Sequence, residues 1–232
     1  MAFQDIEISR MLSLRAEAVD APRSKEFGHI YASVGKRVLD TILAVLLLPI
    51  LLPVLAVVWF LIQRDGGSAV FAQPRIGLNG RTFTCFKFRT MVVNAERVLE
   101  EMCAKNPEIA AEWHTYQKLR NDPRISKIGK ILRATSLDEL PQIFNVLRGD
   151  MSLVGPRPFL PSQQAIYDAA GGKAYYHMRP GITGPWQVFG RGATTFEARV
   201  SFDETYYSKL NFLADLSLIM RTARVVLCRT GH

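Results

Sequence analysis

The longest feature of the hydropathy pattern is an unbroken apolar run over residues 42–62, which reads ILAVLLLPILLPVLAVVWFLI. About twenty helical residues reach ~30 Å, the thickness of the hydrocarbon core of a bilayer. A buried helix of a soluble protein is the alternative, but this run has no polar face. It also begins too far into the chain for a cleavable signal peptide and lacks a small-residue cleavage site. We therefore expect a membrane segment over residues 31–64.

Two prolines, Pro49 and Pro53, interrupt this run, and each removes a backbone donor from a helix. Such a break either kinks a spanning helix or turns it back as a re-entrant hairpin. Positive residues favour the cytoplasmic side of a membrane, and they stand on both sides of the run, at Lys36, Arg37, Arg64, Arg75, Arg81, Lys87 and Arg89. Each half of a hairpin then covers about ten residues or ~15 Å, roughly one leaflet. The pattern favours a re-entrant helix over a kinked full span.

Beyond this segment, residues 68–88 alternate apolar and polar positions around the turn Gly77-Leu78-Asn79-Gly80, which predicts a β-hairpin. After residue 88 the spacing of apolar positions is helical. Residues 1–30 have no strong period, which predicts a polar tail. We therefore predict an α/β fold, a compact and mainly helical domain over residues 65–232 that the membrane helix anchors. The expected helices cover residues 94–119 with an interruption near Asn106-Pro107, 127–132, a stretch that begins at Ser136, 163–176, 196–207 and 213–227.

Basic side chains outnumber acidic ones, 29 against 21, and the formal net charge is +8. This excess predicts an anionic partner, such as nucleic acid, acidic lipid or a phosphorylated substrate. No helix-turn-helix, RRM or zinc pattern supports nucleic-acid binding. Cys85, Cys103 and Cys228 are widely spaced, which indicates neither a zinc site nor a disulfide framework and is typical of a reducing compartment.

Two adjacent carboxylates, Asp138 and Glu139, stand where a helix is expected to begin. Ser136 followed three residues later by Glu139 fits a capping box, and acids in a first turn complement the helix dipole. Arg133 and Arg157 lie within about twenty residues of the pair. A carboxylate pair beside guanidinium groups can bind a divalent cation, attack a phosphorus centre, or do both.

Other charged positions are candidates for binding a phosphorylated substrate. Lys87 and Arg89 fall on one face of the predicted hairpin, although a solvated surface would explain them as well. Arg157 stands between two prolines, so its guanidinium can be held rigidly for bidentate phosphate contact. Arg191 ends a Gly/Pro-rich stretch that lacks the lysine of a P-loop. Asp203 can cap a helix or bind a metal.

Several motifs occur in an order that strongly resembles the bacterial sugar transferases, the small monotopic phosphoglycosyl transferases. The resemblance runs from about Lys36 to the C-terminus, and residues 112–124 are most similar to the branch that starts exopolysaccharide synthesis with a hexose 1-phosphate. The motifs are Lys36-Arg37 with Asp40, Arg75-Ile76-Gly77, and residues 87–91, 136–142, 148–158 and 179–184.

The resemblance implies a re-entrant helix that breaks at Pro53, with Pro49 assisting, and a catalytic domain on the cytoplasmic side of the bacterial inner membrane. Asp138 would be the nucleophile, and Glu139 would help to hold Mg²⁺. The implied substrate-binding side chains are Lys87, Arg89, Arg133, Arg157, Arg191 and Asp203.

The implied reaction transfers a sugar 1-phosphate, of glucose or galactose, from a UDP-sugar to polyprenyl (undecaprenyl) phosphate. It passes through an aspartyl-phosphosugar intermediate and releases UMP. We expect the helix end to keep Asp138 ionised. A catalytically inactive membrane scaffold of the same fold is the alternative. The sequence fixes neither the sugar nor the oligomeric state, for which a homo-oligomer stays open.

Overall fold

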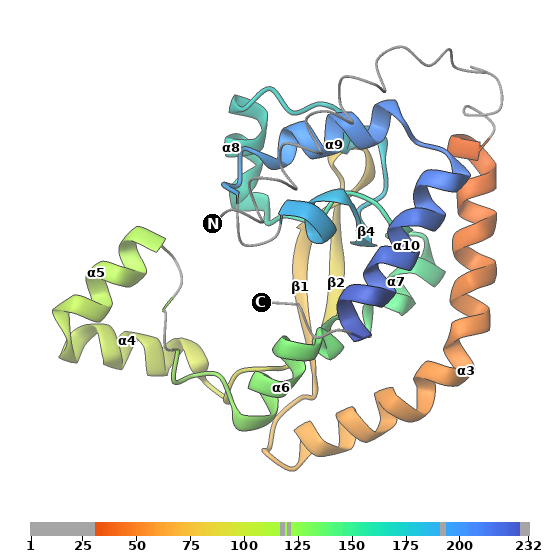
Figure 1. The fold of residues 1–232 in the computed structure, drawn as a ribbon. Coiled ribbons are helices and arrows are strands. Elements are labelled where there is room, and N and C mark those ends of the chain that lie inside the picture. The colour runs from red at the N-terminus through yellow and green to blue at the C-terminus, as the bar shows by residue number, and fades with distance from the viewer. Residues whose placement is uncertain (1–30, 117–118, 120–121, 191–193, 228–232) are drawn as a thin grey trace.

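The computed structural model describes most of the chain after the N-terminal tail, and it is mostly helical (Figure 1). One antiparallel pair of strands and one short parallel pair complete it. The prediction of a compact, mainly helical α/β fold with a short hairpin is confirmed. The tail predicted over residues 1–30 and the candidate Arg191 lie outside the described residues, which are 31–116, 119, 122–190 and 194–227.

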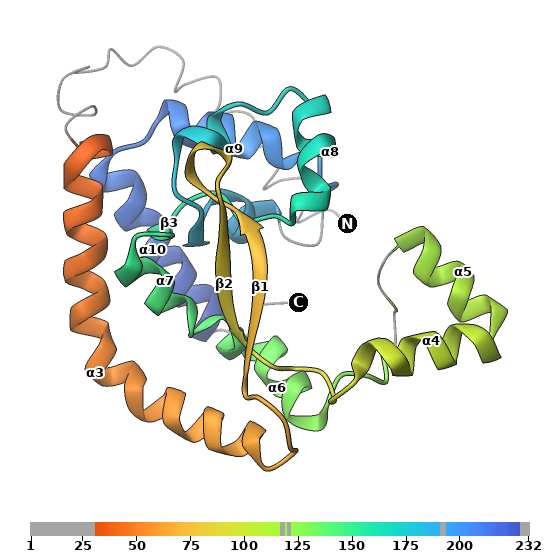
Figure 2. The same ribbon diagram turned by 180° about the vertical axis from the view of Figure 1, so that it is seen from behind.

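A single turn of π-helix, Tyr31–Gly35, leads into helix α3, Lys36–Gln63. Helix α3 is bent in its middle: the first half runs along one side of the domain and the second half passes beneath it (Figures 1 and 2). Pro49 and Pro53 lie inside the helix, and each proline removes a backbone hydrogen bond and promotes a kink. Within the described residues, Tyr31–Gln63 is the one helical segment long and apolar enough to cross a membrane. Re-entry into the bilayer stays a prediction.

Helix α3 has two kinds of surface. Its inner side joins the main hydrophobic core through Ala44, Leu55, Val58 and Ile62. Its other sides carry large apolar side chains that are about half exposed or more, among them Val45, Leu46, Ile50, Val57 and Phe60. A contiguous exposed apolar surface of this kind marks a contact with lipid or with another protein.

The predicted hairpin is confirmed as strands β1, Val70–Ile76, and β2, Thr82–Phe88, which pair antiparallel. The connection Leu78–Gly80 is a single 3₁₀ turn in which Asn79 has a φ of 58°, a left-handed conformation that asparagine tolerates. Cys85 of β2 is fully buried, so one face of the hairpin packs on the core.

Helices α4, Ala95–Lys105, and α5, Pro107–Tyr116, form a pair that stands apart from the rest of the molecule (Figure 2). The predicted interruption near Asn106-Pro107 is confirmed. The Asn106 side chain accepts a hydrogen bond of 2.9 Å from the backbone N–H of Glu108, which begins the second helix.

Helix α6, Lys127–Thr135, is followed by a 3₁₀ turn, Leu137–Glu139, and then by helix α7, Gln142–Arg148. The capping box predicted at Ser136 is wrong. Ser136 has a φ of 57° and ends α6, and its side chain makes no capping hydrogen bond. A residue in the left-handed conformation stops the helix before it. The two carboxylates therefore lie in a tight turn between two helices.

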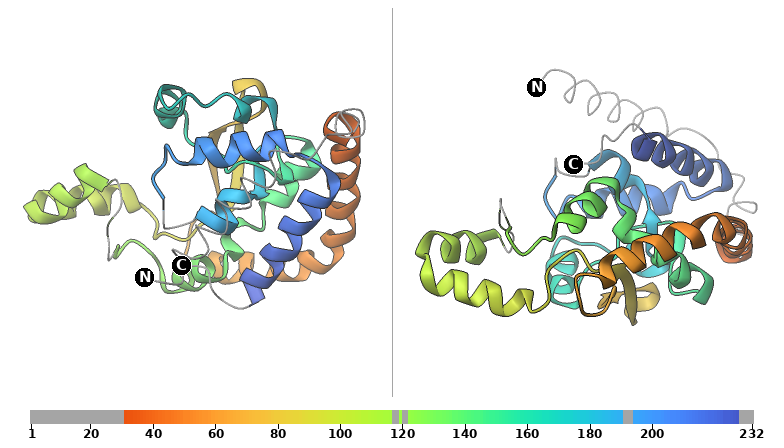
Figure 3. Two further views of the ribbon diagram at one scale, coloured as in Figure 1. Left: turned by 45° about the horizontal axis from the view of Figure 1, so that its top comes forward. Right: turned by 90° about the horizontal axis from the view of Figure 1, so that it is seen from below.

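The C-terminal half surrounds a short parallel pair of strands, β3, Ser152–Val154, and β4, Gly181–Thr183. The single helix predicted over residues 163–176 is wrong, because the chain breaks at Gly171 and Gly172, the first with a φ of +81°. Helix α9, Arg199–Ser208, begins slightly later than predicted. Figure 1 shows α9 across the top of the domain and α10, Phe212–Leu227, descending on the side nearer α3, and the left view of Figure 3 shows both helices (blue) with that top turned forward. The elements are a 3₁₀ turn Pro161–Gln163, α8 Gln164–Ala169, a 3₁₀ turn Ala174–His177, a π turn Trp186–Gly190, α9 Arg199–Ser208 and α10 Phe212–Leu227.

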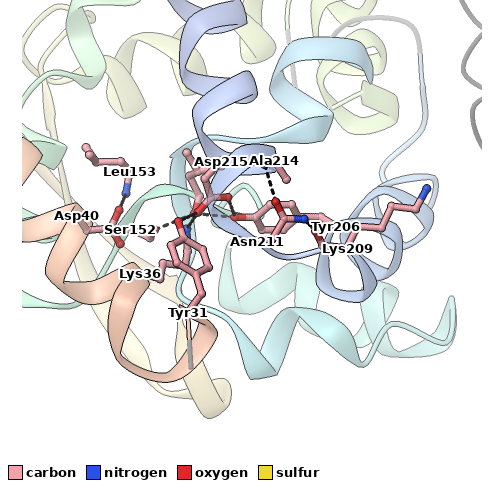
Figure 4. Close-up of polar contacts among 11 residues, drawn as sticks. Tyr31, Lys36, Asp40, Ser152, Leu153, Tyr206, Lys209, Asn211, Ala214 and Asp215 are labelled. Atoms are coloured by element: carbon pink, nitrogen blue, oxygen red, sulfur yellow. Dashed lines mark hydrogen bonds and ion pairs between the residues drawn. The ribbon is translucent and has the colours of Figure 1, made fainter. Parts of the chain in front are cut away.

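A buried polar cluster fixes the start of α3 to the domain (Figure 4). Asp215 of α10 pairs with Lys36 and accepts a hydrogen bond of 2.6 Å from Tyr31 and another from Tyr206. Asp40 of α3 accepts from the backbone N–H of Leu153 at 3.0 Å. A buried charge is tolerated only when it is paired and hydrogen-bonded, so this cluster holds the N-terminal end of α3 against α10 and β3.

Candidate active site

Glu139 lies at the centre of the charged cluster that the sequence predicts. Its Oε1 accepts from the Nζ of Lys87 at 2.9 Å and from the Nη2 of Arg157 at 2.8 Å. Burial alone would raise the pKa of Glu139, but Arg157 and Lys87 outweigh it and lower the pKa to about 2. Glu139 is therefore an anion at neutral pH and neutralises part of the charge of the two cations.

The backbone around Arg157 explains how its side chain is held. Pro156 and Pro158 on either side are buried and fix the chain. A Cβ on Gly155 would lie 2.4 Å from the carbonyl oxygen of Arg179, so only glycine allows this close approach beside the parallel strands. The loop after β3 thus delivers Arg157 to Glu139 from a rigid support.

Asp138 is half-buried in the same turn as Glu139. Burial and the neighbouring Glu139 raise the pKa of Asp138, and Lys87 and Arg133 offset only part of that rise. The shift is opposite to the one expected from a helix N-terminus, because the turn places the carboxylate beside a second anion. That Asp138 is ionised stays a prediction. As an anion, Asp138 is held in a less stabilising environment than Glu139.

A polar pocket of about 200 Å³ opens beside Glu139. Four cationic side chains and one carboxylate are among its lining residues, which include Arg75, Lys87, Glu139, Arg157 and Arg199. An excess of positive charge in a recess attracts anions, and guanidinium groups match the oxygens of phosphates.

A second, mainly apolar pocket of about 320 Å³ lies on the side of the turn that faces α3. Leu47 and Leu51 of α3 form part of its wall together with Ile143 of α7. Glu139 and Arg157 line both pockets. The two recesses therefore meet at this ion pair, one suited to an anionic group and the other to an apolar chain.

Other predicted residues lie outside this centre. Arg133 is exposed and donates from its Nε to the Thr90 hydroxyl at 2.9 Å, close enough to Asp138 to lower the pKa of that carboxyl. Arg89 donates to the backbone carbonyls of Ile62, Gly66 and Ser68, so it fastens the end of α3 and lines neither pocket.

Asp203 is buried on α9 and accepts a hydrogen bond of 2.9 Å from the Tyr167 hydroxyl. Burial raises the pKa of Asp203 to about 7. It lines neither pocket, so the structure separates it from the carboxylate pair.

Sequence reasoning assigned no substrate-binding role to Arg75 or Arg199, although both line the polar pocket. Arg75 could have been found from the hairpin, because in the observed register it shares a face with Lys87. No local sequence pattern identifies Arg199 as a pocket residue, because only the packing of α9 brings it to the site.

The donor chemistry of the carboxylate pair fits Mg²⁺. Within the part of the chain that the structure describes, no group of three or more His, Cys, Asp or Glu side chains could hold a metal. Mg²⁺, however, is commonly held by one or two carboxylates together with substrate phosphates. Among the described residues, the Oε2 of Glu139 accepts one hydrogen bond, a long one of 3.5 Å from the Nη1 of Arg157. It is therefore the better placed oxygen for such a ligand.

The family model described as bacterial sugar transferase matches residues 31–229. The undecaprenyl-phosphate galactose phosphotransferase of Salmonella typhimurium is 45% identical over 84% of this chain, and the UDP-galactose-lipid carrier transferase of Erwinia amylovora is 47% identical over 84%. The chain spans only 41% of the length of each of these relatives. The exopolysaccharide production protein ExoY of Sinorhizobium fredii is 44% identical, with 85% of this chain and 88% of the relative covered. The chain therefore belongs to the bacterial sugar transferase family.

Proposed function

We propose that this chain is a phosphoglycosyl transferase that moves a sugar 1-phosphate from a UDP-sugar to polyprenyl phosphate and so initiates exopolysaccharide synthesis. The observation that carries the proposal is the meeting of a cationic pocket and an apolar pocket at Glu139 and Arg157, next to Asp138. A nucleotide sugar has the diphosphate that the first recess suits, and a polyprenyl phosphate has the chain that the second suits. The names of the relatives support a sugar donor and a lipid carrier.

In the first step, a carboxylate oxygen of Asp138 attacks the phosphorus that is bonded to the sugar. The bond from that phosphorus to the bridging oxygen breaks, and UMP leaves with the electron pair. A carboxylate facing an anionic diphosphate needs its repulsion screened, and Lys87 and Arg157 supply fixed positive charge at that point.

In the second step, an oxygen of the lipid phosphate attacks the same phosphorus. The bond to Asp138 breaks, the carboxylate is restored, and the product is a polyprenyl diphosphosugar. The apolar pocket lies between α3 and the turn that carries Asp138, so a chain lying there would present its phosphate near the intermediate.

Glu139 would hold Mg²⁺ together with oxygens of the diphosphate, and the bound metal would supply further charge screening. The bent α3 would lie in the cytoplasmic leaflet of the inner membrane with both ends on the cytoplasmic side. That arrangement keeps the turn at the height of the lipid phosphate.

The test is release of UMP from UDP-galactose and from UDP-glucose in the presence of polyprenyl phosphate and Mg²⁺. We expect the wild-type chain to release UMP with at least one donor and Asp138→Asn to release none, because the amide is not a nucleophile. Asp65→Asn, in an exposed loop, is the control and should keep wild-type activity. A wild-type chain that releases no UMP with either donor would favour an inactive scaffold.

A further inference from the structure

Two arginines of the polar pocket, Arg75 and Arg199, form no ion pair with any residue that the structure describes. Arg75 donates from Nη1 to the Pro158 carbonyl at 3.2 Å and from Nη2 to Gln73 at 2.8 Å. The guanidinium of Arg199 lies 4.0 Å from the ring centroid of Trp186. The Nε of each arginine is buried and has no hydrogen-bond partner among the described residues. A buried donor without a partner is costly, which indicates a bound group outside the protein.

The charges around these arginines also indicate a bound anion. The pKa of Arg199 is lowered to about 10 by burial and by the positive charges of Arg157 and Arg75, and the nearby Asp203 offsets only part of that shift. The pKa of Arg75 is also lowered, first by burial and then by Arg157. Neither side chain forms an ion pair in the described part of the chain, whereas Lys87 and Arg157 both reach Glu139. An anion bound between them would relieve this repulsion.

The register of the hairpin shows in which order the cations line the pocket. Arg75 pairs with Phe83 and Lys87 pairs with Phe71, so the two cations share a face and stand about 13 Å apart along the strand. Lys87 is at the Asp138 end, since it lowers the pKa of that carboxyl. Helix α9, which carries Arg199, lies near the turn of the hairpin (Figures 1 and 2). The cations are therefore ordered from Lys87 and Arg157 to Arg75 and Arg199, away from the nucleophile.

We propose that Arg75 and Arg199 bind the phosphate that departs with the nucleotide, whereas Lys87 and Arg157 bind the phosphate that is transferred. This assignment rests on the proposed function and adds a leaving-group site to it. When the bond to the bridging oxygen breaks, the electron pair stays on that oxygen, which becomes a terminal oxygen of UMP with an added negative charge. The guanidinium N–H groups compensate that charge and no proton is required.

The test measures the two half-reactions separately in the variant Arg199→Gln: formation of the covalent adduct with release of UMP, and transfer from the adduct to the lipid phosphate. We expect the inhibition constant of UMP against the UDP-sugar to rise about tenfold or more, because a hydrogen bond to a charged group is lost. The covalent adduct is then isolated free of UMP and mixed with polyprenyl phosphate, and the rate of this second step should equal that of the wild type. Arg97→Gln, on the exposed face of α4, is the control and should change neither value.

Arg75→Gln is the second variant and should raise the same constant, so the proposal does not depend on one variant folding. Thermal unfolding confirms that each variant is folded. An unchanged UMP constant in folded variants, or an equal slowing of both half-reactions, would overturn the assignment. If the wild type releases no UMP, the proposed function fails, and calorimetric titration of UMP into the wild type and the two variants still decides whether the arginines bind a nucleotide phosphate.

Discussion

Asp138 and Glu139 are neighbours in one turn, but their carboxylates lie in opposite electrostatic environments. Two cations lower the pKa of Glu139 to about 2, whereas burial and Glu139 itself raise the pKa of Asp138. The sequence predicted the pair and its basic surroundings from the clustering of Arg133 and Arg157 with the acids. It could not predict which carboxylate would receive the cations, because Lys87 reaches the site from a strand far away in the chain.

The two carboxylates should therefore affect stability in opposite directions. We expect Glu139→Gln to destabilise the protein at pH 7 by about 1–3 kcal/mol, because Lys87 and Arg157 lose their partner. Asp138→Asn should leave the stability unchanged or raise it, because it removes an anion that burial and Glu139 disfavour. Chemical denaturation at pH 7 measures both free energies of unfolding.

The pH dependence of the contribution of Glu139 to the free energy of unfolding provides the control. Its pKa is lower in the folded protein than in the unfolded chain, so the stabilisation is complete above about pH 4.5. It should be lost as the pH falls toward about 2. The difference between wild type and Glu139→Gln should shrink over that interval, and a difference that grows on acidification would contradict the assigned environment.

At the scale of the elements, alternation and helical spacing predicted the hairpin, the interruption of α4 and α5, and α10. The errors lie where single residues take left-handed conformations. Ser136 ends α6 where a helix start was expected, and Gly171 divides the helix predicted over residues 163–176. Pattern reasoning missed both because periodicity reports which side chains are buried and not the φ of one residue. The parallel pairing of β3 and β4 was also missed, since each strand has only three residues.

The contact of Gly155 with the backbone beside β4 gives a prediction at this scale. In Gly155→Ala, the added Cβ would meet the Arg179 carbonyl and the Gly181 amide, so the loop must move and carry Arg157 with it. We expect a loss of stability of about 1–3 kcal/mol and a larger relative loss of UMP release. Asp65→Asn, in the exposed turn after α3, is the control and should change neither quantity. A Gly155→Ala variant that matches this control in stability and activity would contradict the account.

The whole molecule places the carboxylate turn between an apolar helix and a cationic recess. The apolar composition of residues 42–62 predicted a long helix, and the structure has one continuous helix there, which is bent in its middle (Figure 1). The re-entrant break at the two prolines stays a prediction. The apolar pocket could not be predicted, because Leu47 and Leu51 meet α6, α7 and β4 only in the folded chain. How deeply α3 enters a bilayer depends on the membrane as well as on the chain, so a topology experiment is needed to test it.

We expect both ends of α3 to face the cytoplasm. Ser33→Cys and Ser68→Cys, each in a background without Cys103 and Cys228, place one label at each exposed end of the helix. An impermeant maleimide should modify both in inside-out membrane vesicles and neither in intact spheroplasts. Labelling of Ser33→Cys from the outside alone would indicate a full span and would contradict the re-entrant helix.

The central claim is that Asp138 attacks the phosphorus of the nucleotide sugar, and the most direct measurement is to locate the covalent group. The wild-type chain is incubated with UDP-galactose or UDP-glucose without lipid acceptor, quenched and digested, and its peptides are weighed by mass spectrometry. The account predicts one added hexose phosphate, on the peptide that contains Asp138, and its loss when polyprenyl phosphate is supplied. A hexose phosphate attached to any other residue, or turnover with no adduct at any time point, would contradict it.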